Sequence, residues 1–491
     1  MKNYIYFIFF VAAIFSYSQS YILNNDCVEK FIEETQELLD DYWDDNDIPG
    51  LAFAIFNNEK IIYQECLGKS TYEQKITNET LFSIQSISKN VTALAVMFAV
   101  QEGLVALDVP ISNYLPDFRV NSCFEENPEQ IITLRMLLSH TAGFTHEAPV
   151  GNNFDCRPYS FEEHVNSIKD TWLKFPVGVS YSYSNLGVDF AAKIIEVKSG
   201  MPFEEFLKNK IFIPLGMNNS TINDDDFCLS NNKTEGTISS VNTAHYKIPL
   251  IGSGAVYTNL LEFVNYVQLQ MNYGKLKEQQ IISQEYLNEI YKIQRFNYAL
   301  GTYIDKSDTN LYINHNGGGY GFAATMLWFP EYNLAAVLLI NNQSSTFEIC
   351  EEIINNYIEI CKPKKDKSIA EEFKKLNDNY FNNKEIFDVY NEQFCTNDTI
   401  FKSEWEKYLG TYSIVFTGFE FDWQAELAFS MGYIAQEVNI LHENNVMKIS
   451  SNWGESILRE YKPGMFFTTG GDVVNYNSEI PTYKNLLMEK K

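Results

Sequence analysis

The stretch LFSIQSISKNVTALAVM places Ser86 three residues before Lys89 at the start of an apolar run. If the run is a helix, residues three apart lie on one face, so the Lys89 amine can reach the Ser86 hydroxyl. Burial and the positive end of the helix dipole would lower the lysine pKa, and a neutral amine can accept the serine proton. The Ser86 amide, free of intrahelical bonding, could donate to an oxyanion. The pair therefore predicts a serine nucleophile with a lysine base.

A serine three residues before a lysine is a weak pattern when taken alone. A helix N-cap serine beside a solvated lysine has the same spacing. The chain contains a second copy, Ser230 and Lys233, in the polar stretch LSNNKTEG, which no apolar helix follows. We assign this second copy to the surface, and the longer context of the first copy distinguishes it.

That context resembles the penicillin-binding protein and class C β-lactamase superfamily of serine hydrolases, in which FSIQSISKNVTALAVM would be the nucleophile motif. The similarity extends over residues 28–360. Its further segments, in superfamily order, are LDVPISNYLPDF, ITLRMLLSHTAGF, PVGVSYSYSNLGVDFAAKIIEVKSGMPFEEFL, IFIPLGM, GSGAVYTNLLEFVNY and INHNGGGYGF. The resemblance implies hydrolysis through an acyl-enzyme, with no metal or organic cofactor.

The resemblance identifies a second motif, Tyr183 and Asn185 in YSYSNLG. Tyr-x-Asn also begins at Tyr257 and Tyr380, so the position of Tyr183 after FPVG and before an amphipathic helix is what selects it. A phenol beside a lysine can hold a lowered pKa and carry the proton between serine and leaving group. Asn185 would hydrogen-bond the substrate amide or ester and hold Lys89. The alternative is a buried tyrosine with a turn asparagine.

The third motif that the resemblance implies is His315-Asn316-Gly317 at a strand edge, where glycines would let a ligand approach the backbone. The amide of Gly318 would be the second oxyanion donor beside that of Ser86. β-Lactamases place Lys-Thr-Gly at this strand. A histidine is mostly neutral above about pH 6.5 and anchors a substrate carboxylate less well. Penicillin is therefore a less expected substrate, since His-x-Gly here is typical of carboxypeptidase-like, aminopeptidase-like and esterase-like members.

Other residues with reactive or aromatic side chains are expected to play supporting roles. His140 in LLSHTAGF is expected to be a hydrogen-bonded core residue. The remaining histidines have no metal-binding spacing, and neither a His-Glu-x-x-His motif nor a Gly-x-Ser-x-Gly elbow occurs. Tyr181, Tyr320 and Trp328 are candidates for the lining of the cleft.

The elements that must hold these motifs come from both ends of the first 360 residues. Apolar residues at helical spacing over residues 27–42 predict an amphipathic helix, and LAFAIFNNEKIIYQEC predicts two strands joined at residues 57–58. Helical patterns dominate residues 81–270. Strand patterns return in LYINHNG, FAATMLWF and LAAVLLINN, before a closing helix at 346–360. This order predicts an α/β fold in which an antiparallel sheet, flanked by helices, is assembled around an inserted helical region.

The remaining segments suggest four divisions of the chain. We expect a signal peptide at 1–20, a hydrolase domain at 21–362, and a polar linker with some helix at 363–401. Short strand patterns with frequent turns at 402–491 predict a small all-β domain, a barrel.

The first twenty residues and the cysteines favour a secreted protein. Lys2, an apolar run and small serines have the layout of a secretory signal peptide, with an uncleaved anchor as the alternative. Eight cysteines in an oxidising compartment favour disulfides, with Cys123–Cys156 as one candidate. Cys350 and Cys361 share a predicted helix that would hold them about 16 Å apart, beyond disulfide reach. Glycosylation sequons begin at Asn78, Asn218, Asn219, Asn232, Asn342 and Asn397.

The composition excludes some partners and leaves a hydrolase as the main expectation. A net charge of −27 disfavours nucleic acid, and no segment after the leader is apolar for long enough to span a membrane. We expect a small-molecule or peptide acyl substrate, cleaved by an esterase or peptidase, with a true β-lactamase as the second choice. A non-catalytic scaffold is the alternative class. It would have no use for the full set of Ser86, Lys89, Tyr183, Asn185 and His315.

Overall fold

The structure is a computed structural model, and it describes the chain in several ranges separated by gaps. The predicted signal peptide and the candidate pair Cys123–Cys156 lie outside these ranges. Within them, no helix has both the length and the apolar character needed to cross a membrane. The described ranges are 25–70, 73–122, 124–151, 158–238, 241–242, 247, 249–306, 310–387, 400–415, 437–452, 454–468, 473–477, 480–483 and 486–491.

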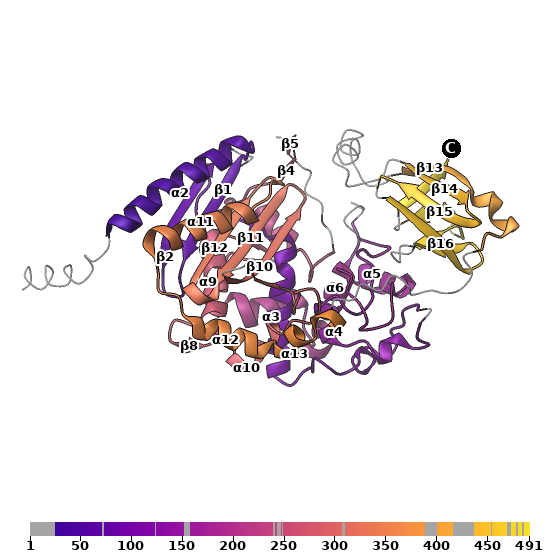
Figure 1. The fold of residues 1–491 in the computed structure, drawn as a ribbon, viewed down its shortest axis with the longest axis horizontal. Coiled ribbons are helices and arrows are strands. Elements are labelled where there is room, and N and C mark those ends of the chain that lie inside the picture. Colours follow the sequence, from indigo (N-terminus) through magenta and orange to yellow (C-terminus); the bar gives the residue numbers. More distant parts are fainter. Residues whose placement is uncertain are drawn as a thin grey trace, which may run out of the picture.

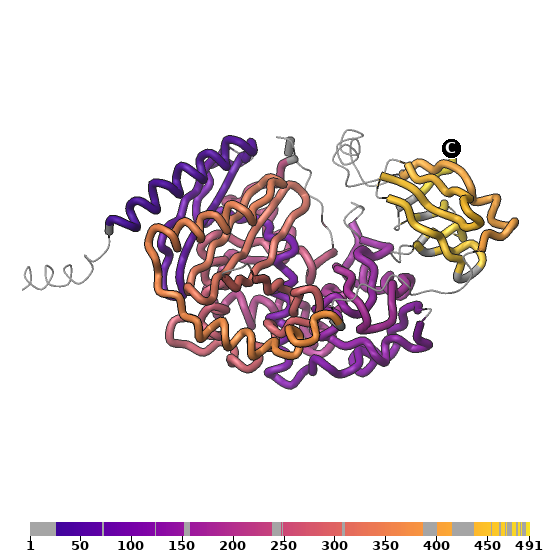
Figure 2. The backbone as a smooth tube through the Cα atoms, viewed as in Figure 1, coloured from indigo at the N-terminus to yellow at the C-terminus, as the bar shows by residue number. Residues whose placement is uncertain are grey.

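A six-stranded antiparallel sheet forms the centre of the first domain, in the order β2-β1-β12-β11-β10-β9 (Figure 1). Phe53 pairs with Leu338, so strands from both ends of the domain lie side by side (Figure 2). This assembly confirms the predicted sheet. The strands are β1 (Gly50–Phe56), β2 (Ile61–Gly68), β9 (Tyr303–Lys306), β10 (Leu311–Gly319), β11 (Phe322–Phe329) and β12 (Leu334–Ile340).

Different helices cover the two faces of this sheet. The helices α2 (Asn25–Asp45) and α11 (Phe347–Cys361) lie over one face (Figure 1). There the rings of Phe31 and Tyr357 pack edge to face, with their centroids 5.0 Å apart. Cys350 and Cys361 both lie on α11, which agrees with the prediction that they do not pair. Alternate residues of β1 divide between the faces: one apolar cluster takes Leu51, Phe53 and Ile55, and the other takes Ala52, Ala54 and Phe56.

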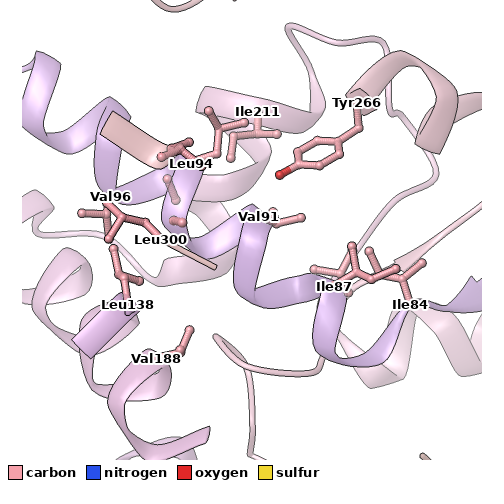
Figure 3. Packing of buried hydrophobic residues seen from close by; sticks show 14 of the residues in the cluster. Ile84, Ile87, Val91, Leu94, Val96, Leu138, Val188, Ile211, Tyr266 and Leu300 are labelled. Atoms are coloured by element: carbon pink, nitrogen blue, oxygen red, sulfur yellow. The ribbon is translucent and has the colours of Figure 1, made fainter. Parts of the chain in front are cut away.

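The helical region between β2 and β9 covers the second face. Its central helix is α3 (Ser88–Gln101), which is buried from Ser88 to Ala99 because apolar residues occur all round it. Figure 3 shows Val91, Leu94 and Val96 with side chains of neighbouring helices around them. The other helices of this region are α4 (Leu134–Leu138), α5 (Phe161–Ser167), α6 (Asn185–Ser199), α7 (Phe203–Leu207), α8 (Asp224–Leu229), α9 (Leu260–Met271) and α10 (Gln284–Ile290).

The predicted linker at 363–401 is wrong over residues 367–382, because they pack against the first domain. Phe373 and Tyr380 belong to its main apolar core, and the buried Asn377 side chain accepts the Ile293 amide at 2.6 Å. The polar composition hid this packing, since few residues of the segment face the core. Residues 388–399 lie outside the described set. The helices are α12 (Lys367–Leu376), α13 (Asp378–Asn382) and α14 (Lys384–Phe387).

The C-terminal part is a closed antiparallel barrel, as predicted. Its first strand pairs with both the second and the last, which removes the sheet edges. Trp405 is fully buried in the barrel core and packs against Phe466 with ring centroids 5.3 Å apart. The strands are β13 (Gly410–Val415), β14 (Glu437–Glu443), β15 (Val446–Ser451), β16 (Gly454–Lys462), β17 (Met465–Phe467), β18 (Val473–Asn475), β19 (Thr482–Tyr483) and β20 (Leu486–Lys490).

Candidate active site

Ser86 lies in a tight 3-10 turn, Gln85–Ile87, directly before α3. Gln85 has a φ of +48°, a left-handed conformation that costs a non-glycine residue about 1–3 kcal/mol and is concentrated at functional sites. The side chain of Gln85 donates to Ser83 Oγ at 2.8 Å, and Ser83 itself pairs with Tyr257 in a two-stranded ladder. The strained turn is therefore held on the side of the preceding chain as well as by α3.

Lys89 is buried one turn later and reaches Ser86, as the spacing predicts. Its Nζ lies 3.1 Å from Ser86 Oγ and donates to the backbone oxygen of Ser253 at 2.8 Å. Burial lowers the Lys89 pKa to about 7, while the charges of Asp189 and Glu147 raise it and limit the fall. A large fraction of the amine is therefore neutral near pH 7 and can accept the Ser86 proton.

Tyr183 is hydrogen-bonded with Ser86, and its ring lies under the Lys89 amine, with Nζ 4.8 Å from the ring centroid. Burial raises the Tyr183 pKa well above its usual value, and the hydrogen bond with Ser86 only partly offsets this. The predicted lowering of the phenol pKa is wrong, because burial outweighs the hydrogen bond with Ser86 and the charge of Glu147 acts in the same direction as burial. Tyr183 is thus a neutral phenol that can donate a proton.

Asn185 begins α6 and lies 4% exposed beside the same pocket. Its side-chain nitrogen donates to Glu147 Oε1 at 2.9 Å, and the same carboxylate oxygen lies 2.7 Å from Nδ1 of His146. The sequence analysis predicted that Asn185 would hold the Lys89 amine, but in the structure the amine donates to the Ser253 carbonyl. Glu147 was not predicted, since nothing in its local pattern separates it from a surface glutamate.

His315 ends a chain of hydrogen bonds through the core. The Ser184 amide donates to His140 Nδ1 at 3.2 Å, so a neutral His140 ring carries its proton on Nε2, which donates to Tyr298 Oη at 3.1 Å. Tyr298 Oη then donates to His315 Nε2 at 3.2 Å, and His315 Nδ1 donates to the backbone oxygen of Asn316 at 2.8 Å. The sequence of donors and acceptors fixes both tautomers. It also agrees with the expected hydrogen-bonded core position of His140.

This chain changes the interpretation of His315. The side chain is 2% exposed, and burial lowers its pKa to about 3, with the Lys89 charge acting in the same direction. One ring nitrogen accepts a hydrogen bond from Tyr298 and the other donates one to Asn316, so the imidazole is neutral. His315 is also not among the residues that line the pocket. The predicted contact of His315 with substrate does not fit this arrangement, because Tyr298 takes the nitrogen that a substrate would need. His315 instead supports β10 from inside the core.

The two glycines that follow have different surroundings. A Cβ on Gly317 would lie 2.0 Å from the Ile84 backbone oxygen, so this glycine lets β10 lie against the chain just before Ser86. A Cβ on Gly318 would meet nothing within 4 Å, and Gly318 lines the pocket. The predicted close approach is therefore made by the protein itself at Gly317, while the space for a ligand lies at Gly318.

A pocket beside Ser86 brings together residues from three of the predicted segments. Ser86, Asn185 and Gly318 line it, as does Tyr320, one of the aromatic candidates; Trp328 belongs to the apolar core. No lysine or arginine is among the lining residues that the structure describes. Within the described ranges, no three His, Cys, Asp or Glu side chains converge as metal ligands would. The other lining residues are Ser83, Gln85, Asp224, Leu250, Ser253, Gly254, Ala255 and Tyr257.

Asp189 is a further functional candidate that the sequence analysis missed. It lies one turn into α6, fully buried, and accepts hydrogen bonds from the amides of Gly252 and Ser253, both at 2.9 Å. A single aspartate inside the apolar helical run NLGVDFAAKII was a usable signal, because a buried carboxylate needs specific partners.

Comparison with known proteins identifies the family to which the chain belongs. A family model described as Beta-lactamase matches residues 35–355. The chain is 28% identical over 271 residues to Beta-lactamase-like protein 4 of Dictyostelium discoideum, covering 51% of this chain and 47% of that protein. It is 26% identical over 181 residues to Esterase EstB of Burkholderia gladioli, covering 34% of this chain and 45% of that protein. The chain thus spans about half the length of these curated relatives.

A solved structure resembles the chain over most of its length. The octameric penicillin-binding protein homologue from Pyrococcus abyssi superposes with a TM-score of 0.58 at 16% identity, covering 92% of this chain and 95% of that chain. At this identity the likeness concerns the fold alone.

Proposed function

Since the chain belongs to the beta-lactamase family, we propose that it is a serine hydrolase that cleaves an amide or ester through an acyl-enzyme on Ser86. The observation that carries the proposal is the 3.1 Å contact between Ser86 Oγ and the buried amine of Lys89. Its lowered pKa supports a base at neutral pH. Gly318, which lines the same pocket, supports an oxyanion site.

In the proposed reaction, neutral Lys89 takes the Ser86 proton as Oγ attacks the substrate carbonyl. The amides of Ser86 and Gly318 donate to the oxyanion that forms. Tyr183 gives its phenolic proton to the leaving group when the bond to the carbonyl carbon breaks, and regains a proton from the Lys89 ammonium. Water then attacks the acyl carbon with Lys89 as base, and the acid leaves as Ser86 recovers its proton.

The charges near the pocket favour an ester or an amide without an essential carboxylate. Among the lining residues within the described ranges, Asp224 is the single charged side chain, and the nearby His315 is neutral. A carboxylate such as that of penicillins would meet no cationic partner among these residues. We therefore place an esterase or an aminopeptidase-like peptidase first, ahead of a carboxypeptidase or a true β-lactamase.

The test is covalent labelling of Ser86 together with hydrolysis. Wild-type protein should form an adduct with a fluorophosphonate, found on Ser86 by peptide mass spectrometry, and should hydrolyse p-nitrophenyl esters faster than nitrocefin. Ser86→Ala should abolish both activities, whereas Ser230→Ala, the matched serine of the other Ser-x-x-Lys pair, should retain them. A wild-type protein without an adduct would favour the scaffold alternative, and faster nitrocefin turnover would favour the β-lactamase.

We also propose that the chain is secreted, glycosylated and disulfide-bonded. The Cys27 and Cys361 thiols are hydrogen-bonded, and each lies four residues from one ring of the Phe31–Tyr357 contact between α2 and α11. In an oxidising compartment the two thiols would lose two protons and two electrons to a disulfide-bearing oxidoreductase. Protein expressed with its own leader, alkylated without reductant and digested, should yield the linked peptide. Alkylation of both cysteines would contradict the pairing.

A further inference from the structure

A loop formed by residues 250–256 lies between α3 and α6 and reaches the Lys89 amine. On the α3 side, Thr92 Oγ1 donates to the Gly252 backbone oxygen at 2.6 Å, and Lys89 Nζ donates to that of Ser253 at 2.8 Å. Ser253 also lines the substrate pocket. The position of the Ser253 carbonyl therefore determines where one hydrogen of the lysine amine points, and with it where the lone pair lies.

Asp189 holds this loop from the α6 side. Its Oδ1 accepts the amides of Gly252 and Ser253, both at 2.9 Å, and its Oδ2 accepts the Ser253 hydroxyl at 2.9 Å. One buried carboxylate thus fixes both peptide units that precede the carbonyl contacted by Lys89. A Cβ on Gly252 would lie 2.9 Å from the Val188 backbone oxygen, which shows how closely the loop approaches α6.

His164 supplies the charge that such a buried carboxylate requires. Its Nε2 lies 3.3 Å from Asp189 Oδ2, and its Nδ1 lies 2.8 Å from the Val150 backbone oxygen. Both partners are acceptors, so both ring nitrogens carry protons and the ring is an imidazolium. Burial lowers the His164 pKa, but the hydrogen bond and charge of Asp189 outweigh it and the net pKa is raised. Asp189 and His164 form a buried ion pair.

Asp189 acts on Lys89 through its charge as well as through the loop. The groups that face the lysine are Tyr183, which is neutral, His140 and His315, whose pKa values are lowered, and the carboxylates Glu147 and Asp189. Of the two carboxylates, Asp189 has the larger effect in raising the Lys89 pKa against burial. Removing its charge would therefore lower the pKa of the base further.

We propose, on the basis of the function proposed above, that Asp189 is a positioning residue for Lys89 and that the His164 imidazolium supports it. The carboxylate holds the 250–256 loop so that the Ser253 carbonyl receives the lysine amine and directs its lone pair to Ser86. The same carboxylate sets the electrostatic field in which the base works.

The test replaces Asp189 with asparagine, which keeps the shape but cannot accept hydrogen bonds at both terminal atoms. We expect kcat/KM for a p-nitrophenyl ester, and the rate of fluorophosphonate labelling, to fall about 10²-fold, because a base displaced by about 1 Å loses that much. The acid limb of the labelling rate against pH should also move to lower pH. A merely structural role would lower the rate without moving the limb.

Two further variants make the result decisive. Glu331→Gln removes another buried carboxylate, one that does not line the pocket and that accepts a hydrogen bond of 3.0 Å from the Leu311 amide. This variant should leave the acid limb unmoved. If Asp189→Asn does not fold, His164→Gln takes its place. It keeps the carboxylate but withdraws the positive charge behind it, so the limb should move to higher pH.

The outcomes separate this inference from the proposed function. Wild-type protein that does not label at Ser86 would overturn both. Wild-type protein that labels, with an acid limb that does not move in Asp189→Asn, or in His164→Gln where that variant is needed, would overturn the positioning role alone.

Discussion

Side chains of β1 alternate between two environments, and the two faces of the sheet differ in what they bury. The cluster under α2 and α11 joins apolar residues, and none of the buried charged residues that the structure describes belongs to these two helices. The opposite face also has an apolar core, but Lys89, His140, His164 and Asp189 are buried within it at 2% exposure or less. Burying such groups costs free energy unless each is paired or neutral. The first face therefore contributes mainly stability, whereas part of the second is organised for chemistry at some cost in stability.

The largest test of this difference removes the buried amine. Lys89→Met keeps an unbranched side chain but deletes the base, so kcat/KM for a p-nitrophenyl ester should fall about 10²- to 10⁴-fold. The midpoint of thermal unfolding should not decrease, because the variant no longer buries a group that prefers to be charged. Parallel steady-state kinetics and calorimetry measure both quantities. A variant that unfolds earlier while retaining activity would reverse the roles assigned to the two faces.

The second test addresses the apolar face. Phe31→Ala removes a fully buried ring that packs against Tyr357 and should reduce the free energy of unfolding by about 3–5 kcal/mol. The folded fraction should retain the wild-type kcat/KM, because no group of the site contacts this ring. Phe381→Ala, which truncates a phenylalanine that is 39% exposed, is the matched control and should cost less than about 0.5 kcal/mol. Urea unfolding and ester hydrolysis together decide the result.

The apolar face could be predicted from sequence much more fully than the site. The apolar run LAFAIF before the turn at residues 57–58 predicted the strand, because strand-forming residues and turn residues are local signals. The contact of Ser86 with Lys89 was equally local. The partner of His315 was not, since Tyr298 approaches it through the fold and from a separate segment. The sequence therefore identified the histidine but not the buried partner that its ring has in the fold.

Charge effects were the other limit of sequence analysis. The Tyr183 pKa was predicted in the wrong direction because the sequence did not reveal how deeply the fold buries this phenol or that Glu147 lies near it. The aspartate within an apolar run was a local signal that Asp189 needs partners, but those partners, the amides of Gly252 and Ser253, lie more than sixty residues away along the chain. Such terms depend on distances between segments, which spacing along a chain does not contain.

A third test adds a single methyl group where β10 packs against the chain just before Ser86. Gly317→Ala would place a Cβ 2.0 Å from the Ile84 backbone oxygen and force β10 away from the nucleophile turn. Overpacking of this kind costs about 1–3 kcal/mol, and kcat/KM should fall with it because Ser86 follows Ile84 so closely. Gly318→Ala, where the Cβ is in open space, should leave the free energy of unfolding unchanged. Equal destabilisation in both variants would contradict the close packing assigned to Gly317.

The pH dependence of the reaction is the smallest test and the one most specific to the second face. With a Lys89 pKa of about 7, kcat/KM for a neutral ester should fall about tenfold per pH unit below that value, because only the neutral amine is a base. His140 and His315, whose pKa values are lowered, should add no further limb between pH 5 and 8. Stability should change in the same direction but over a higher pH interval. The unfolded lysine binds a proton up to about pH 10.4 while the folded one releases it near 7, so this group's contribution to stability rises with pH across that interval. Phe31→Ala should keep the same limb, since the apolar face has no part in the titration, and a limb above pH 9 in the wild-type protein would mean that Lys89 is charged and cannot be the base.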